Sequence, residues 1–267
     1  MRRFVSVISV LIAAFVYAAP APAESLKEHN FGVVFMHGKW GAPEDRPLYK
    51  LSLALESADV ALEMPTMPWS RNRNYDVSYE DAMTEIDKAV AKLKGRGAVR
   101  IVVGGHRFGA TASLAYGATR NGVTGILALA PGHVPDMGRF RGAMADNVFS
   151  AKRLLADGQG DAAFEFTDLN QGRQLGKRAT PKIFLSYFDP EGMGAMSLNA
   201  PKIKPDTAVF WAIGRQDSLF GTGKTAIYDK IPPHPKSRYV ELPGGHVETP
   251  SESVGIVLDW LRSLAQP

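Results

Sequence analysis

The chain of 267 residues contains no cysteine. This absence excludes a disulfide framework, a thiolate metal site and a cysteine nucleophile. The six histidines are scattered and no His-Glu-x-x-His motif occurs, so a standard zinc site is not expected. A phosphate-loop lysine motif is also missing, and we therefore expect neither a metal nor a cofactor.

The chain also lacks a large excess of charge of one sign, and it has few long apolar runs. The chain has 31 basic and 27 acidic side chains, and the resulting formal charge of +4 is too small and too dispersed to predict nucleic-acid binding. Beyond the N-terminal stretch, no segment approaches the roughly 20 apolar residues that span a bilayer. We therefore expect the partner to be a small molecule, and not a nucleic acid or a membrane.

The N-terminal stretch has the pattern of a secretory signal peptide. Two arginines precede an apolar segment from Phe4 to Ala19, and a small-x-small tripeptide ends at Ala23. The segment is shorter than a membrane span and is followed by prolines. We expect residues 1–23 to be removed, residues 24–267 to form one domain, and the protein to be exported to the periplasm or secreted.

Apolar runs and helical periodicities alternate along the rest of the chain. Runs typical of strands buried on both faces predict strands at 31–36, 59–64, 99–103, 125–130, 208–213 and 238–242. Between them, Ser78 and Asp81 form a capping box for a helix that Gly95 ends, and the last helix is expected to start at Thr249 with a threonine cap. This order predicts an α/β fold, a mostly parallel twisted sheet with helices on both faces.

One long region, about 132–206, interrupts the alternation. Asp146 to Ala156 is expected to be helical. Pro181 to Phe188 is predicted as a helix capped by Thr180, with a strand as the alternative. Because ligands bind at the carboxyl ends of parallel strands, a helical insertion above those ends is expected to act as a lid.

Short segments at the strand ends carry a resemblance to a known family. Met36-His37-Gly38, the turn Gly105-His106-Arg107-Phe108-Gly109, and Gly244-Gly245-His246 resemble the signature regions of the α/β-hydrolases, in particular the serine esterases and lipases. Asp217 stands where that family keeps its acid. The resemblance covers nearly all of the chain after the signal peptide in order of elements, although the family's first antiparallel strands have little room here.

The resemblance implies the α/β-hydrolase fold and the hydrolysis of an ester or related acyl bond. Residue 107 takes the position of the nucleophile, Asp217 that of the acid and His246 that of the base, in the chain order the family uses. The sharp strand-to-helix turn exposes residue 107 at the top of the sheet. Gly105 and Gly109 flank it because the backbones pass too closely there for a Cβ.

The same resemblance suggests which groups surround the reacting centre. The oxyanion would be held by the backbone N–H of Phe108 and by that of Lys39 or Trp40. Trp40, Trp69 and Met193 are candidate substrate contacts, with core or lid packing as the alternative. His37 is a further candidate, with a structural role in the loop that shapes the oxyanion hole as the alternative.

Other polar residues have simpler interpretations. His106 is expected to pack beside the turn. His29, His133 and His234 are expected in loops. Arg71 and Arg73 are either solvated surface charges or contacts for an acidic substrate group.

The nucleophile position departs from the family, because Arg107 replaces its serine. A guanidinium stays protonated and offers no lone pair for attack. In a comparable serine triad, loss of the nucleophile costs about 10⁶ in turnover. Ordinary ester hydrolysis is therefore expected to be impaired or rerouted, and whether the chain is an enzyme stays open.

Four interpretations of Arg107 remain. It is a replacement retained to bind a small anion beside a helix N-terminus, without catalysis. Alternatively, His246 and Asp217 activate water while Arg107 polarises the substrate. A third reading is a variant or sequencing error, since serine and arginine codons can differ by one base. In the fourth, another serine attacks, and Ser113 is the nearest downstream.

Overall fold

The computed structural model describes residues 25–266, so the expected signal peptide lies outside the described residues. Six strands form one sheet in the order β2-β1-β3-β4-β7-β8, and every neighbouring pair in it is parallel. The strands are β1 (Phe31–Met36), β2 (Ala61–Glu63), β3 (Arg100–Arg107), β4 (Gly125–Pro131), β7 (Ala208–Gly214) and β8 (Arg238–Leu242). The prediction of a mostly parallel sheet is confirmed.

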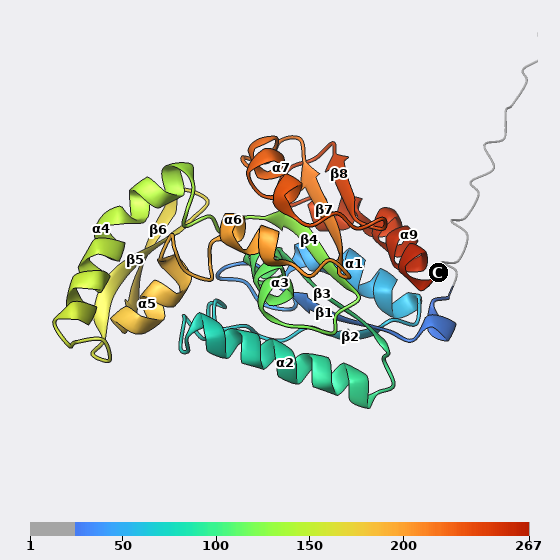
Figure 1. The fold of residues 1–267 in the computed structure, drawn as a ribbon, viewed down its shortest axis with the longest axis horizontal. Coiled ribbons are helices and arrows are strands. Elements are labelled where there is room, and N and C mark those ends of the chain that lie inside the picture. Colours follow the sequence, from blue (N-terminus) through green and yellow to red (C-terminus); the bar gives the residue numbers. More distant parts are fainter. Residues whose placement is uncertain (1–24, 267) are drawn as a thin grey trace, which may run out of the picture.

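Helices cover both faces of this sheet (Figure 1). Helices α2 (Tyr79–Gly95) and α3 (Phe108–Thr119) pack on one face, and α1 (Arg46–Ser57) and α9 (Val254–Ala265) on the other. Alternate residues of β1 belong to the two cores, Val34 to the first and Val33 to the second. Because side chains alternate along a strand, burial on both faces explains the continuous apolar runs in the sequence.

Two predicted caps are present and a third is wrong. Ser78 and Asp81 form the capping box of α2, and the Thr180 side chain accepts a hydrogen bond from the Ile183 N–H, so the helical reading of α5 (Pro181–Phe188) is confirmed. The last helix does not start with a threonine cap. Glu248 is the N-cap residue of a short helix α8 (Thr249–Glu252), which Ser253 separates from α9. The Thr249 hydroxyl instead donates to the Gly245 carbonyl at 2.9 Å.

The inserted region contains more structure than was predicted. Helix α4 (Gly138–Ala156) starts earlier than expected, and an antiparallel hairpin of β5 (Phe164–Asn170) and β6 (Arg173–Ala179) was not expected at all. With α5 these elements lie together beyond one end of the sheet (Figure 1). The remaining short elements are η1 (Lys27–His29), α6 (Met196–Asn199), η2 (Ala200–Lys202), α7 (Thr222–Ala226) and η3 (Tyr228–Lys230). No helix within residues 25–266 combines the length and apolarity needed to cross a membrane.

Candidate active site

The turn from β3 into α3 has the strained geometry that the glycine pattern indicated. Arg107 has φ 59° and ψ −117°, a conformation that a side chain with a Cβ adopts only at a cost of about 1–3 kcal/mol. A Cβ on Gly105 would lie 2.8 Å from the Cα of Gly109, so the two backbones do pass too closely for one. The fold therefore holds the residue at position 107 in a forced orientation at the end of the strand.

Asp217 and His246 meet beside this turn. Asp217 follows β7 and His246 follows β8, and the two side chains are joined by a 2.5 Å contact between Nδ1 and Oδ2. The other carboxylate oxygen of Asp217 accepts the Leu219 N–H at 2.8 Å, and its side chain is 0% exposed. A carboxylate held in this way fixes the imidazole with its proton on Nδ1, which leaves the lone pair on Nε2.

The His246 ring lies close to the turn. A Cβ on Gly132 would lie 3.1 Å from His246 Nε2 and 3.8 Å from the Arg107 Cα. The structure thus brings together residues 107, 217 and 246, which the sequence placed at three separate strand ends.

His106 supports the same histidine from behind. Its Nε2 lies 2.7 Å from the His246 backbone carbonyl and therefore carries the donated proton. Burial lowers the pKa of His106 to about 3, which keeps the ring neutral. The expected packing beside the turn is thus combined with a hydrogen bond that holds the His246 loop.

The Arg107 side chain lies against the loop after β1. A Cβ on Gly38 would be 2.7 Å from the Arg107 Cδ. The guanidinium Nη2 is enclosed and has no hydrogen-bond partner among residues 25–266. Burial lowers the pKa of Arg107, and the charges of Asp45 and Asp217 oppose that shift. The cleft therefore contains a half-buried cation that no carboxylate of the described chain neutralises by direct contact.

The backbone N–H groups of Lys39 and Trp40, the two candidates for the second oxyanion donor, differ in whether another acceptor already binds them. The Trp40 N–H donates to the Trp69 carbonyl at 2.8 Å and is therefore not free to bind an oxyanion. No hydrogen bond joins the Lys39 N–H to any acceptor within the described part of the chain. The Phe108 N–H is at the first position of α3, where a helix has no internal acceptor for it. Phe108 and Lys39 remain as the candidate pair.

A cavity of about 830 Å³ opens over these groups. Arg107, Asp217 and His246 line it, together with Lys39 and Phe108. Its remaining walls come from the segment after β4, the tip of the β5–β6 hairpin and the segment after β7, namely residues 132–134, 137–140, 169–172, 216, 218, 219 and 222. The region expected as a lid thus supplies part of the wall.

None of the four expected substrate contacts belongs to this cavity lining. The Trp40 indole Nε1 donates instead to Asp168 at 2.8 Å. His37 is 0% exposed, with Nδ1 donating to the Gly38 carbonyl at 2.8 Å and Nε2 accepting the Met67 N–H at 3.0 Å. Trp69 is also fully buried, and its Nε1 donates to the His37 carbonyl. Met193 is half-buried and packs against the core. The loop-shaping interpretation of His37 fits these contacts.

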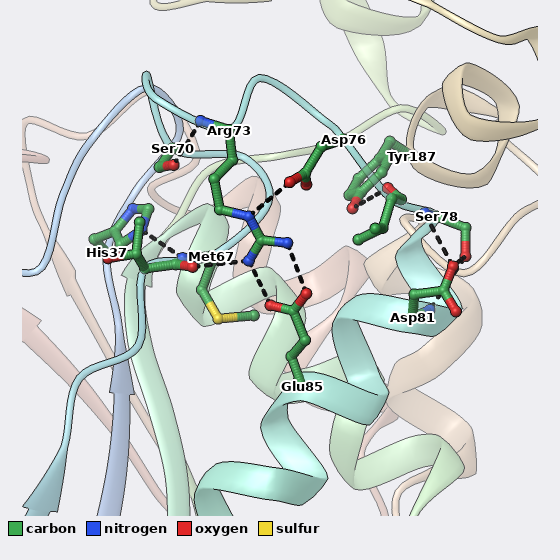
Figure 2. A network of polar contacts seen from close by, with 11 residues as sticks. His37, Met67, Ser70, Arg73, Asp76, Ser78, Asp81, Glu85 and Tyr187 are labelled. Atoms are coloured by element: carbon green, nitrogen blue, oxygen red, sulfur yellow. Dashed lines mark hydrogen bonds and ion pairs between the residues drawn. The ribbon is translucent and has the colours of Figure 1, made fainter.

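Two other interpretations can now be compared with the contacts. Figure 2 shows Arg73 pointing into a group of acceptors, with Nη1 and Nη2 bonded to both oxygens of Glu85 at 2.6 and 2.7 Å and Nε to Asp76 at 3.0 Å. Arg73 therefore anchors its loop to α2 and has no donor directed at a ligand. Ser113 is fully buried inside α3, where its hydroxyl donates to the Ala110 carbonyl.

Two residues of the site region were not recognised in the sequence. Asp168, on β5, is 0% exposed and accepts a hydrogen bond from Lys39 Nζ at 2.6 Å. His133 was expected as an ordinary loop residue, but it is buried in the cavity wall against Phe108, and burial holds its pKa well below the ordinary value. Neither has a short-range signal, because both depend on partners far along the chain. Within residues 25–266, no group of three or more histidine or acidic side chains could hold a metal ion.

Comparison with known proteins relates the fold to one class of enzymes. No family model matches the chain, and no curated protein matches its sequence. Among solved structures, it is similar to a monoacylglycerol lipase of Paleococcus ferrophilus, with a TM-score of 0.59 and 20% identity over 90% of this chain and 96% of the lipase. A carboxyl esterase of Bacillus coagulans gives a TM-score of 0.64 and 12% identity over 91% and 93%. Est1E of Butyrivibrio proteoclasticus gives a TM-score of 0.55 and 17% identity over 91% of this chain and 88% of Est1E.

Proposed function

We propose, from the α/β-hydrolase fold that the chain shares with these lipases and esterases, that the protein descends from acyl-ester hydrolases and keeps the acid–base half of their machinery without the nucleophile. The observation that supports this most directly is the 2.5 Å contact between His246 and Asp217 beside the strained turn at Arg107. As written, the protein is expected to hydrolyse esters at most slowly.

The division of chemical work follows from the contacts. Asp217 orients the imidazole, and His246 Nε2, the ring nitrogen that Asp217 leaves free, would act as the base for position 107. The N–H groups of Phe108 and Lys39 would hold the developing oxyanion. Arg107 supplies neither a lone pair nor a removable proton, so the covalent step of a serine hydrolase has no starting point.

Replacement of Arg107 by serine tests this proposal. We expect Arg107→Ser to raise kcat/KM for p-nitrophenyl butyrate at least 10³-fold over the unsubstituted protein, since the substitution supplies a nucleophile to the proposed base and oxyanion donors. Arg107→Ala is the matched control, because it removes the guanidinium without supplying a hydroxyl. The double variant Arg107→Ser, His246→Ala should lose the gain.

Two results would count against the proposal. If Arg107→Ser gains nothing over Arg107→Ala, His246 does not serve as a base for position 107. If the arginine form is already as fast as the serine form, water activated by His246 and Asp217 is the nucleophile, and the chain is a working hydrolase by another route.

A second candidate function uses the same cleft for binding a small anion. The observation that favours it is the enclosed Arg107 Nη2 without a partner among the described residues, at the N-terminus of α3. A carboxylate would receive charge-assisted hydrogen bonds from the guanidinium and would be favoured by the helix dipole. Apolar side chains also line the cavity, among them Val134, Met137 and Leu219. We therefore propose a carboxylate with an apolar tail.

Calorimetric titration of the protein as written can test this candidate. Octanoate should bind at least 100-fold more tightly than acetate or inorganic phosphate, because each buried methylene adds about 0.8 kcal/mol. Arg107→Gln should weaken octanoate binding at least tenfold, whereas Arg139→Gln, at an exposed position of the same cavity wall, should change it less than threefold. Absence of saturable heat with octanoate, or an unaltered affinity in Arg107→Gln, would reject it.

Export is a further part of the proposal and rests on the sequence pattern of residues 1–23 alone. The full chain expressed in a bacterium should yield a periplasmic or secreted protein whose N-terminus is Glu24. An uncleaved N-terminus in the cytoplasmic fraction would overturn it.

A further inference from the structure

The inserted hairpin is joined to the loop after β1 by a fully buried carboxylate. Asp168, on β5, accepts hydrogen bonds from Lys39 Nζ at 2.6 Å, Trp40 Nε1 at 2.8 Å and the Tyr75 hydroxyl at 2.7 Å. Asp168 is 0% exposed and Lys39 is 6% exposed. Both partners on the β1 side precede Asp168 by well over a hundred residues. We call Lys39, Trp40, Tyr75 and Asp168 the clamp.

The clamp is held together by charge as well as by hydrogen bonds. Burial lowers the pKa of Lys39, and the charge of Asp168 is the largest influence opposing that shift. The ammonium also lies 5.0 Å from the ring centre of Phe140 and 5.1 Å from that of Phe188. A buried charge without its partner is costly, so Asp168 and Lys39 restrain each other's position strongly.

The hairpin also contacts the backbone that it restrains. Asn170 Nδ2 donates to the Lys39 carbonyl at 3.4 Å. On the other side of this residue, the Gly38 carbonyl accepts from His37 Nδ1 at 2.8 Å and from the Gly41 N–H at 3.1 Å. The peptide between Gly38 and Lys39 is trans, so its N–H points away from those two donors. Trp40 follows with φ 57°, a conformation that needs support from its surroundings.

We infer that Asp168 is a positioning residue for the oxyanion donor: by gripping the side chains of Lys39 and Trp40, it keeps the Lys39 N–H in the orientation that an acyl-transfer site requires. This inference rests on the proposed function, since it assigns a role to the same site. It makes the inserted hairpin a component of the catalytic geometry in addition to a wall of the cavity. Asp168 acts through Lys39 and does not touch the reacting atoms.

The first test measures amide exchange by NMR in the protein that retains Arg107. In Asp168→Asn the backbone amide of Trp40, which is bonded to the Trp69 carbonyl, should exchange with solvent at least tenfold faster, and the Trp40 indole N–H resonance should shift upfield. The indole N–H of Trp260, bonded to the Lys236 carbonyl, is the internal control and should not change. Asp161→Asn, at an exposed ion pair with Lys182, is the control variant. An unchanged Trp40 amide would overturn the inference.

The second test measures kinetics in the Arg107→Ser background. Adding Asp168→Asn should lower kcat at least tenfold and leave KM within threefold. A displaced oxyanion donor weakens binding of the transition state much more than binding of the substrate. A raised KM at unchanged kcat would mean that Asp168 only shapes the binding wall, and would overturn the positioning role. If Arg107→Ser alone is inactive, the proposed function fails; if it is active and Asp168→Asn has no effect, only this inference fails.

A milder variant covers the case in which Asp168→Asn does not fold. Tyr75→Phe removes one of the three donors and leaves the carboxylate with Lys39 and Trp40. It should accelerate exchange of the Trp40 amide and lower kcat in the same direction, by about threefold each. Equal exchange and equal kcat in Tyr75→Phe and its parent would overturn the inference.

Discussion

Two cations, Lys39 and Arg107, lie in the wall of one cavity, and only the first is paired with a carboxylate. Lys39 is buried, and the fully buried carboxylate of Asp168 lies 2.6 Å from its ammonium. Arg107 is half-buried, and its guanidinium Nη2 has no hydrogen-bond partner among the described residues. The structure around Lys39 therefore depends on its charge being matched. The structure around Arg107 is held by the strained turn and by backbone packing, whatever the side chain does.

This comparison indicates that Lys39 stabilises the fold, whereas Arg107 is available for a ligand in the cavity. A buried pair fixes its surroundings because removing either member leaves an uncompensated charge. Arg107 has no carboxylate in direct contact within the described chain. Its charge therefore contributes no comparable free energy to folding. The two residues should consequently respond to substitution in different ways, and stability measurements can separate them.

The largest effect is expected at the paired cation. Asp168→Asn should lower the free energy of unfolding by about 3–5 kcal/mol, because Lys39 is then buried without a counter-charge. Urea unfolding followed by tryptophan fluorescence measures this. Asp161→Asn, at an exposed pair, should stay within about 0.5 kcal/mol of the parent. A loss for Asp168→Asn as small as that would end the distinction between the two cations.

An intermediate effect is expected from acid. The pKa of His106 is about 3 in the folded chain against an ordinary 6.5, so below pH 6.5 the unfolded chain binds the proton that the folded chain refuses. Stability should therefore fall by about 3 kcal/mol between pH 6.5 and 4 from this residue alone, with His37 and His133 acting in the same direction. His106→Asn should flatten the pH dependence of the urea midpoint by that amount. An unaltered slope would show that the acid sensitivity arises elsewhere.

The smallest effect is expected at the unpaired cation. Arg107→Gln keeps the length of the side chain and removes its charge, so the free energy of unfolding should change by less than about 1 kcal/mol and should not fall. Thermal unfolding at neutral pH, with Arg139→Gln as the exposed control, measures it. A loss of 2 kcal/mol or more would mean that Arg107 supports the fold after all.

The sequence predicted those features that local chemistry determines. The glycines around Arg107 indicated the turn because close backbone passage is a property of a few neighbouring residues. Apolar runs indicated the central strands β1, β4 and β7 of the parallel sheet, since burial on both faces leaves a continuous pattern. The order of residues 107, 217 and 246 indicated a common site only through the family resemblance, and the structure brings them together.

What the sequence could not predict depends on distant partners. Strand β6 has the burial pattern of a mostly exposed segment, so neither an apolar run nor a strict alternation marks it. Asp168 looks like any surface aspartate until Lys39 and Tyr75 are placed beside it. The availability of the Trp40 N–H depended on the Trp69 carbonyl, and the threonine cap failed because Thr249 bonds to Gly245 in the loop that carries His246.

The clamp also has a consequence for the order of folding. Lys39 and its carboxylate partner are 129 residues apart, so closing that contact costs more chain entropy than forming the turn at Arg107, which joins adjacent elements. A chain that emerges from its N-terminus onward carries Lys39 unmatched until β5 has followed. We therefore expect the loop after β1 to become ordered later than the pairing of β1 with β3, whose strands both precede β5 in the chain.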